Sequence, residues 1–270
     1  MNTPTCVSTR YEFGQNWKKF ANELSAASIE QAALGLARLL PADEISGRDV
    51  LDIGCGSGLH ALAALRLGAS SVTAIDIDED SVATTRQVLS LHAPPGANWS
   101  ATVKSVFDLE DMPQFPVVYS WGVLHHTGDM YGAIRCAADR VAPGGGLYLA
   151  LYRKTPMCRL WRAEKWLYTN APNWGRRSLE IGYVAAFRLA MAIQGRNFRD
   201  YVASYVRNRG MHWMTDVRDW LGGYPYESIS KDEMLSFTQD LGLSAIRLFC
   251  RRPGIGLFGT GCDEYALRKA

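Results

Sequence analysis

The first part of the chain alternates between short apolar runs and stretches with helical spacing. Residues 50–53 are a short apolar run that contains one acid, Asp52, and residues 117–124 are a continuous apolar run; residues 71–77 are rich in β-branched side chains. Apolar residues recur at helical spacing through residues 59–67, and residues 81–91 form a second predicted helix. Strands that alternate with helices predict an α/β domain with a mostly parallel sheet.

This alternation stops after a predicted helix at residues 130–141 and a strand at residues 147–152. Residues 153–227 are instead helical, basic and rich in tryptophan and tyrosine, and we expect them to form an insertion over the carboxyl edge of the sheet. Within the insertion, the apolar run at residues 183–193 predicts a buried helix, with the face of a homodimer as the alternative. Turn residues mixed with large aromatics predict loops at 210–216 and 219–226.

Both ends of the chain add to the predicted core. Residues 25–40 have the pattern of an amphipathic helix. Ser230 and Glu233 have the spacing of a capping box, which predicts a helix that ends before Gly242. Two strands are predicted after it, at residues 243–250 and 264–267. The predicted core therefore consists of residues 45–152 and 228–270, with residues 153–227 inserted between them.

Three glycines at alternate positions follow the first apolar run. The heptad D-I-G-C-G-S-G at residues 52–58 joins a predicted strand directly to a predicted helix. A strand, a glycine turn and a helix open a βαβ nucleotide-binding unit, in which the helix N-terminus presents N–H groups to a ligand. A dinucleotide fingerprint needs glycine or alanine at the sixth position from Gly54, where this chain has Leu59. The spacing therefore disfavours a dinucleotide.

The heptad resembles the first motif of the class I S-adenosylmethionine-dependent methyltransferases. The phrase Val-Leu-His-His after the strand at residues 117–124, and the P-G-G-G turn before the strand at 147–152, are also similar to that family. The chain departs from the family at Pro116, where an acid usually precedes the strand. The resemblance implies a Rossmann-like, mostly parallel seven-stranded sheet with helices on both faces. It also implies that residues 1–44 form a helical segment over the cofactor site.

The same resemblance implies which residues hold S-adenosylmethionine. An acid about twenty residues after the glycines accepts both ribose hydroxyls, and Asp76 matches it, whereas Asp78 is expected to cap the following helix. Asp108 matches the acid that takes the adenine amino group, with Asp111 as second candidate. The expected cofactor-binding residues are Asp52, Gly54, Cys55, Gly56, Gly58, Asp76, Ile77, Asp108, Leu109 and Trp121.

Methyl transfer to a weakly acidic hydroxyl or to a carbon acid needs a general base. His125 and His126 are the main candidates, because they stand at the carboxyl end of a central strand, where open α/β sheets bind ligands. Further candidates lie in the insertion, namely Glu164, Glu180, His212 and Asp216. No metal is required by the transfer, and the scattered cysteines contain no Cys-x-x-Cys pair of the kind found in zinc sites.

The insertion carries most of the positive charge. Between Arg153 and Arg209 there are twelve Lys or Arg and three acids, so that this segment carries +9 and the remainder −7. Arginine binds phosphate and carboxylate groups bidentately, which favours an anionic acceptor such as a natural-product acid, a sugar phosphate or an isoprenoid diphosphate. A solvated basic face is the alternative. The expected acceptor-binding residues are Tyr11, Trp17, Arg153, Trp161, Arg176, Arg177, Trp213 and Tyr224.

Length and composition limit the class of protein. With 270 residues, 47% of them hydrophobic, the chain is long enough for one sizeable core with an elaboration. No apolar run reaches ~18 residues and the first ten residues lack a signal-peptide core, so we expect a cytoplasmic protein without a transmembrane helix. A small-molecule methyltransferase is the main interpretation. An RNA methyltransferase and a non-catalytic cofactor-binding protein are the alternatives, and no appended RNA-binding module supports the former.

Overall fold

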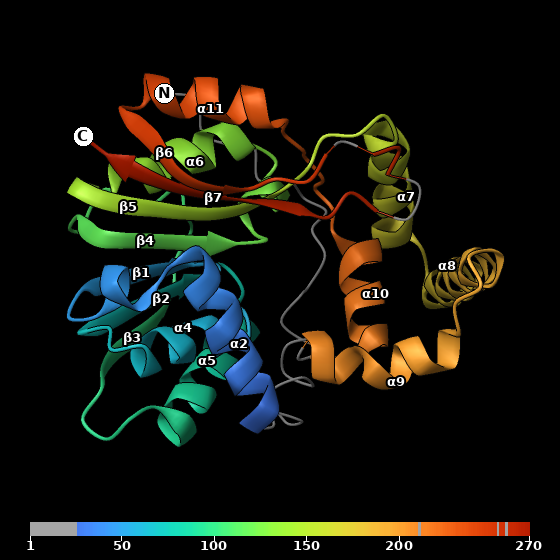
Figure 1. Cartoon of the computed structure of the whole chain (residues 1–270), viewed down its shortest axis with the longest axis horizontal. Coiled ribbons are helices and arrows are strands. Elements are labelled where there is room, and N and C mark those ends of the chain that lie inside the picture. The colour runs from blue at the N-terminus through green and yellow to red at the C-terminus, as the bar shows by residue number, and fades with distance from the viewer. Residues whose placement is uncertain (1–25, 210–211, 253, 257–258) are drawn as a thin grey trace.

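A seven-stranded sheet forms the centre of the molecule (Figure 1). The computed structural model describes residues 26–209, 212–252, 254–256 and 259–270. The strand order is β3-β2-β1-β4-β5-β7-β6; β1 to β5 pair in parallel, and β7 runs antiparallel between β5 and β6. The predicted fold class is therefore confirmed. The strands are β1 (Asp49–Ile53), β2 (Ser71–Asp76), β3 (Asn98–Val103), β4 (Phe115–Trp121), β5 (Val141–Tyr152), β6 (Leu243–Phe249) and β7 (Cys262–Lys269).

Helices cover both faces of this sheet, which explains why its central strands are continuously apolar. On β1, Val50 packs with α2, α4 and α5 on one face, whereas Leu51 and Ile53 pack with α6 and α11 on the other. Successive strand residues point to opposite faces, so each needs an apolar side chain. The helices of the core are α2 (Ala26–Leu39), α3 (Ala42–Ile45), α4 (Leu59–Arg66), α5 (Glu79–His92), α6 (Met130–Asp139) and α11 (Lys231–Asp240).

Two predicted helix caps are present in the structure. The Asp78 side chain accepts a hydrogen bond from Ser81 N at 2.8 Å at the start of α5. Ser230 and Glu233 form the capping box that begins α11. Strand β3 ends at Val103, because the residues after it turn instead of continuing the ladder.

Four helices between β5 and α11 lie beyond the carboxyl ends of β4 and β5 (Figure 1). We call these helices, residues 158–222, the cap. Arg153 and Ile229 form an isolated parallel bridge, so the chain leaves and rejoins the core side by side. The leading helix α2 contacts both α4 and the cap helix α9. The cap consists of α7 (Cys158–Asn170), α8 (Asn173–Ile193), α9 (Phe198–Arg209) and α10 (Trp213–Gly222).

Helix α10 occupies residues 213–222, where the loop prediction is wrong, whereas residues 223–226 are non-helical as predicted. Trp213, Val217 and Leu221 recur at a spacing of four residues and are all buried. With Tyr168 and Tyr205 they form the centre of the cap's own apolar cluster. Burial of this stripe outweighs the turn-forming residues around it.

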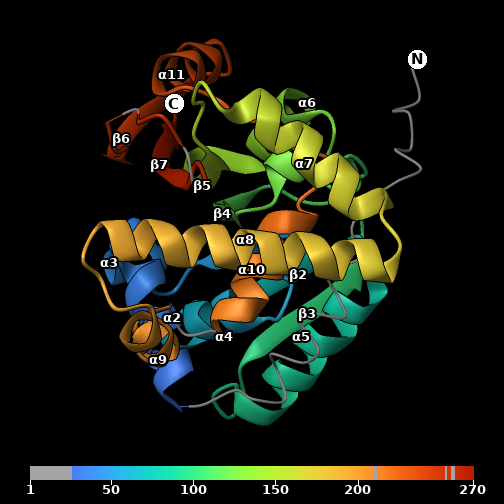
Figure 2. The same cartoon turned by 90° about the vertical axis from the view of Figure 1, so that its right-hand side faces the viewer.

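The prediction that residues 183–193 are buried is also wrong. They form the second half of α8, in which only Met191 is buried. Tyr183 and Phe187 pack on the cap's apolar cluster, whereas Leu189 and Ile193 are exposed. The helix is apolar on two opposite sides, and only one of them contacts the rest of the molecule (Figure 2).

Candidate functional site

The glycine turn lies between β1 and α4, at the carboxyl edge of the sheet. Gly54, Gly56 and Gly58 have φ angles of 80°, 51° and 75°, in the left-handed region that favours glycine. A Cβ at Gly54 would lie 2.4 Å from Val123 Cγ2, and one at Gly58 would lie 2.8 Å from Thr85 Cα. Conformation and space therefore both require glycine, and the turn leaves bare backbone for a ligand.

Asp76, at the end of β2, fixes the turn through its carboxylate. Its Oδ2 accepts a hydrogen bond from Gly56 N at 3.0 Å, and its Oδ1 accepts one from Asp78 N at 3.0 Å. Burial raises the pKa of Asp76, and these two N–H donors partly offset the effect. A carboxylate has about four acceptor positions, so Asp76 retains capacity for further donors.

Asp52 is a buried carboxylate on β1 whose Oδ2 has no hydrogen-bond partner among the described residues. Burial, and then repulsion by Asp76, raises the pKa of Asp52 to about 7. Buried polar atoms are nearly always hydrogen-bonded, so an unpaired one at the edge of a glycine turn indicates a missing donor. A cationic donor would satisfy Oδ2 and restore the charged form of the carboxylate.

Cys55 fills the interior of the turn. Thr85 Oγ1 donates a hydrogen bond to Cys55 Sγ at 3.3 Å and lies 3.2 Å from the carbonyl oxygen of Gly56. Burial raises the pKa of the Cys55 thiol, so the group stays protonated and is not a nucleophile. Its backbone N–H donates to Ile75 O at 3.0 Å and helps to anchor the turn.

The remaining predicted cofactor residues lie at the edge formed by β2 and β3. Asp108 is exposed in the turn after β3, and Ile77 is exposed directly after β2. Leu109 is instead buried in the core against Phe115. The second candidate for the adenine contact, Asp111, forms an ion pair with Lys104. Asp108 is thus the better placed of the two acids.

Two residues that sequence reasoning missed surround Trp121 at the end of β4. Trp121 Nε1 donates a hydrogen bond to Glu264 Oε1 at 3.2 Å, and Glu264 also pairs with Arg38 of α2. The ring of His60 meets Trp121 and Tyr119 edge-on at 5.9 and 5.4 Å between centroids. Burial lowers the pKa of His60 to about 4, so its ring is neutral.

The position of His60 could have been noticed in the sequence, because it is the second residue of the helix that follows the glycine turn. Glu264 gives no such signal. It reaches Trp121 only because β7 inserts between β5 and β6 in the folded sheet.

The predicted base His125 is fully buried and neutral. Its Nδ1 accepts the backbone N–H of Tyr152 at 3.3 Å, and its ring packs on that of Tyr152 at 3.8 Å between centroids. The proton of the neutral ring therefore sits on Nε2, which has no partner in the part of the chain that the structure describes. Burial, with smaller contributions from His126 and Lys165, holds the pKa of His125 well below its usual value.

His126 has the opposite arrangement. Its Nδ1 lies 2.8 Å from the carbonyl oxygen of Pro225, which can only accept a hydrogen bond. The neutral ring therefore has its proton on Nδ1 and its lone pair on Nε2. Gly223, at the end of α10, lies against this ring, and a Cβ there would be 2.6 Å from His126 Cε1. The segment that directly follows the cap, residues 223–225, thus fixes both the tautomer and the position of His126.

A lysine is buried within the cap near the histidine pair. Lys165 Nζ donates to Trp220 O at 2.5 Å and lies 3.4 Å from the centroid of the Trp220 ring. Burial lowers the pKa of Lys165 to about 7, although Glu164 at 3.5 Å opposes the effect. Nothing in the local sequence distinguishes Lys165 from the exposed lysines.

The other predicted bases lie in the cap. Glu180 accepts a hydrogen bond from Tyr168 Oη at 2.8 Å and lies 3.3 Å from Arg218 Nε. Asp216 accepts a short hydrogen bond from Tyr205. His212 is exposed at the start of α10. Glu180 and Asp216 thus stabilise the contacts between cap helices, and Glu164 lies beside Lys165.

The structure does not bring the predicted acceptor-binding arginines together. Arg153 forms a buried ion pair with Asp263, and Arg176 donates to the carbonyl oxygens of Tyr168 and Thr169 at the end of α7. Arg177 is exposed on α8.

The predicted acceptor aromatics are also separated. Trp161 is buried and donates from Nε1 to Gly256 O at 2.7 Å, whereas Trp213 is part of the cap's apolar cluster. Tyr224 is partly exposed, directly before Pro225. Tyr11 and Trp17 lie outside the described residues.

No helix among the described residues is long and apolar enough to cross a membrane. The same residues contain no group of three or more His, Cys, Asp or Glu side chains that could hold a metal ion.

Comparison with solved structures supports the fold. The magnesium protoporphyrin IX methyltransferase of Synechocystis, solved with S-adenosylhomocysteine, superposes with a TM-score of 0.57 at 13% identity, covering 95% of this chain and 94% of that one. The N-methyltransferase NodS of Bradyrhizobium japonicum, also solved with S-adenosylhomocysteine, gives a TM-score of 0.54 at 13% identity, covering 96% and 98%.

Sequence relatives match less than half of the chain. The ubiquinone biosynthesis O-methyltransferases of Xanthomonas euvesicatoria and Xanthomonas axonopodis are 39% and 40% identical over 116 and 123 residues, which are 42% and 44% of this chain. The chain spans about half the length of these relatives, 46% and 48%. The family model described as a methyltransferase domain matches residues 25–214. The chain therefore belongs to the methyltransferase-domain family, whose class I members use S-adenosylmethionine, as the glycine heptad predicts.

Proposed function

We propose that this chain transfers the methyl group of S-adenosylmethionine to a hydroxyl oxygen of a small aromatic acceptor. The tautomer of His126 carries the proposal, because an oxygen nucleophile needs a base and Nε2 of this ring bears the lone pair. The O-methyltransferase activity named for the Xanthomonas relatives supports the choice of oxygen.

The residues at the carboxyl edge fit S-adenosylmethionine. Asp52 Oδ2 is a buried acceptor that has no donor among the described residues. We propose that the amino group of the methionine moiety donates a hydrogen bond to it. The ribose hydroxyls are assigned to Asp76 and the adenine amino group to Asp108, as the family resemblance implies. When bound, S-adenosylmethionine supplies an electrophilic sulfonium methyl group.

His126 is the proposed general base. Its Nε2 accepts the hydroxyl proton, while Nδ1–H remains bonded to Pro225 O and stabilises the positively charged ring that results. The segment that carries His126 also contacts the glycine turn, because Val123 packs directly on Gly54. His126 N donates to Val123 O at 2.9 Å. One short segment therefore positions the base relative to the cofactor site.

Aromatic side chains around the histidine favour a flat acceptor. The Tyr152 ring meets His126 at a right angle, with 5.2 Å between centroids, and meets Trp220 of α10 at 5.6 Å. Trp121 is partly exposed at the end of β4. Such rings bind a flat apolar body and exclude water from the transfer. The basic insertion also predicts an anionic acceptor, so the aromatic acceptor would carry a carboxylate or phosphate group.

Formation of S-adenosylhomocysteine by the full chain, measured with phenols, matched anilines and carboxylated analogues of each, tests the proposal. We expect turnover with hydroxyl acceptors, with the methyl group on oxygen in the product by mass spectrometry. A faster reaction of carboxylated phenols would support the anionic acceptor. Methylation of the anilines alone, or of RNA in a parallel assay, would overturn the proposed acceptor class. A thermal shift with S-adenosylhomocysteine separates loss of cofactor binding from the wrong acceptor.

A further inference from the structure

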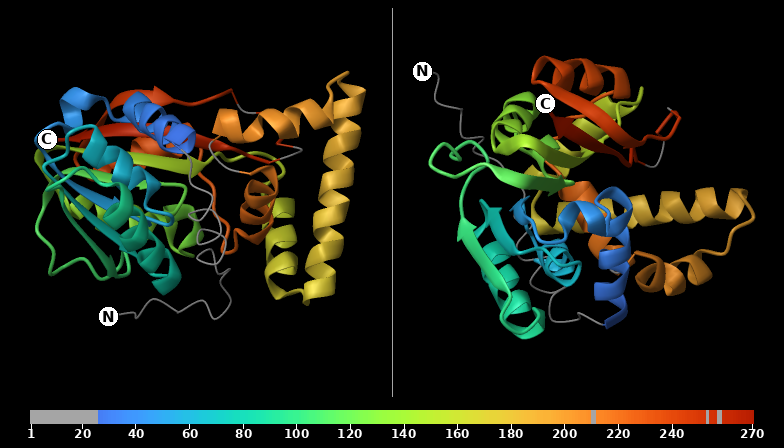
Figure 3. Two further views of the ribbon diagram at one scale, coloured as in Figure 1. Left: turned by 90° about the horizontal axis from the view of Figure 1, so that it is seen from below. Right: turned by 60° about the vertical axis from the view of Figure 1, so that its left-hand side comes forward.

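The outer side of α8 is an exposed apolar surface. Trp174, Ile181, Leu189 and Ile193 are 77%, 63%, 63% and 78% exposed. Their spacing of seven, eight and four residues places them on one side of the helix, opposite Tyr183 and Phe187, which face the cap. Figure 3 shows α8 forming one side of the molecule. We call it the outer face of α8.

Positive charge borders the outer face of α8. Arg177 and Arg188 are exposed on one flank of the apolar stripe, and Arg196 and Arg199 are exposed just beyond its end. Residues 170–200 contain five arginines and two acids, and one of those acids, Glu180, is bonded to Tyr168 and Arg218 inside the cap. The exposed charge beside the stripe is therefore almost entirely positive.

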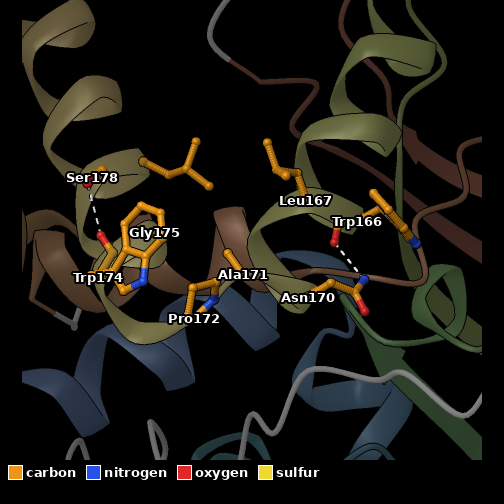
Figure 4. A pocket seen from close by; sticks show the side chains of 9 residues that line it. Trp166, Leu167, Asn170, Ala171, Pro172, Trp174, Gly175 and Ser178 are labelled. Carbon is orange, nitrogen blue, oxygen red and sulfur yellow. Dashed lines mark hydrogen bonds between the residues drawn. The ribbon is translucent and has the colours of Figure 1, made fainter.

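An apolar pocket continues this surface at the turn between α7 and α8 (Figure 4). It has a volume of about 460 Å³. Trp166 and Leu167 contribute from α7, and Trp174 and Leu179 from α8, with Pro172 between them. Trp166 and Leu167 are themselves about half exposed. The pocket has the size and apolar lining that suit a hydrocarbon chain.

We propose that the outer face of α8, with this pocket, docks the chain onto an anionic lipid bilayer. Tryptophan and branched aliphatic side chains on one side of a helix, with arginine on the flank, match a helix that lies in the membrane interface. Arg177 borders the stripe, where its guanidinium group can reach anionic headgroups; those of Arg188 and Arg196 also lie over the rings of Phe198 and Tyr201, at 5.3 and 5.8 Å. Docking goes beyond the proposed methyl transfer and does not depend on it.

A second copy of the chain fits this surface less well. An antiparallel two-fold pairing of the outer faces would place the Arg177 and Arg188 flank beside the same flank of the copy, and like charges repel. An anionic bilayer instead complements both the apolar stripe and the arginines. The described helices contain no membrane-spanning candidate, so the docked α8 would lie parallel to the surface.

Flotation of the full chain with lipid vesicles tests this proposal. The vesicles are phosphatidylcholine alone or phosphatidylcholine mixed with phosphatidylglycerol. The test variant is Ile181→Glu with Leu189→Glu, and its matched control is Leu34→Glu with Leu91→Glu, at residues of α2 and α5 that are 58% and 68% exposed. Arg177→Gln with Arg188→Gln tests the charge. Circular dichroism and the thermal shift with S-adenosylhomocysteine confirm that each variant folds.

We expect the unaltered chain and the α2/α5 control to float with the anionic vesicles and much less with the neutral ones. The α8 glutamate pair should reduce the bound fraction by at least about tenfold, and the arginine pair should reduce it on anionic vesicles only. Absence of binding to anionic vesicles would overturn the proposal. So would a dimer, seen by analytical ultracentrifugation, that the α8 glutamate pair dissociates, because the face would then belong to a second copy.

Discussion

Nδ1 of His126 lies 2.8 Å from the carbonyl oxygen of Pro225, whereas Nδ1 of the adjacent His125 accepts the backbone N–H of Tyr152. The two neighbouring imidazoles are thus held in opposite tautomers, and only His126 has its lone pair on Nε2. His125 is buried and neutral, with its pKa well below the usual value. Position and tautomer therefore assign different roles to two residues that look equivalent in the motif.

His126→Asn separates these roles. The asparagine amide can still donate to Pro225 O, but it has no basic nitrogen, so we expect kcat to fall by about 10²- to 10⁴-fold. The dissociation constant of S-adenosylhomocysteine should not change, because His126 does not belong to the glycine turn. Single-turnover kinetics and calorimetry measure the two quantities. His92→Asn, in the last turn of α5, is the matched control; an equal loss in both variants would refute a base at position 126.

Gly223→Ala tests the position of the base from the cap side. A Cβ at residue 223 would lie 2.6 Å from His126 Cε1, so the imidazole must move. We expect kcat to fall by at least about tenfold, because proton transfer requires hydrogen-bond geometry. Binding of S-adenosylhomocysteine should be retained. Gly35→Ala in α2, where a Cβ would meet nothing within 4 Å, should leave kcat unchanged. Equal kcat values for the two variants would show that Gly223 does not position the ring.

The core that carries the cofactor site could be predicted from the sequence, because the sequence signals of its elements are local. Continuous apolar runs identify strands buried on both faces, and the heptad at residues 52–58 identifies the turn from its spacing alone. Ser230 and Glu233 are three residues apart, and their capping box depends on no distant contact. The structure adds the reason for the glycines, since Val123 and Thr85 occupy the space that side chains would need.

The cap and the surroundings of His126 could not be predicted in the same way, because their contacts join segments that are distant in the sequence. Arg153 has the charge expected of an acceptor ligand, but Asp263 of β7 neutralises it. The tautomer of His126 depends on Pro225, at the far end of the cap. The apolar stripe on the outer side of α8 resembles a buried stripe in sequence, and only the packing shows which side of the helix is covered.

Asp52→Asn should raise stability and weaken cofactor binding. Burial raises the pKa of Asp52 from its ordinary 3.8 to about 7, so between these pH values the folded chain holds a proton that the unfolded chain has lost. Stability should therefore fall as the pH rises from about 4 to about 7 and level off above it. Asparagine cannot ionise, so at pH 8 we expect a gain of up to about 4 kcal/mol in the free energy of unfolding.

The gain from Asp52→Asn should vanish near pH 4, where Asp52 is protonated in the folded chain, and urea unfolding at both pH values measures it. The affinity for S-adenosylhomocysteine should fall at least about tenfold, because the neutral amide attracts a cationic amino group less strongly than a carboxylate does. Asp139→Asn, at an exposed carboxylate at the end of α6, serves as the control for both measurements. A lower stability of the Asp52→Asn variant at pH 8 would mean that Asp52 is paired and charged in the folded chain.

Lys165 and Glu164 form a buried pair inside the cap. Lys165 is fully buried, and burial also raises the pKa of Glu164. Lys165→Met removes the cation but leaves the carboxylate buried, so we expect a loss of about 3 kcal/mol in the free energy of unfolding. Adding Glu164→Gln removes the remaining charge and should recover most of that loss.

Urea unfolding of the two single variants and the double variant gives the coupling energy between Lys165 and Glu164. Lys104→Met, which breaks an exposed ion pair with Asp111, should leave the free energy of unfolding nearly unchanged. Additive effects of the two cap substitutions would show that the carboxylate does not depend on Lys165. In that case the contribution of the lysine would come from its hydrogen bond to Trp220 O and its contact with the Trp220 ring.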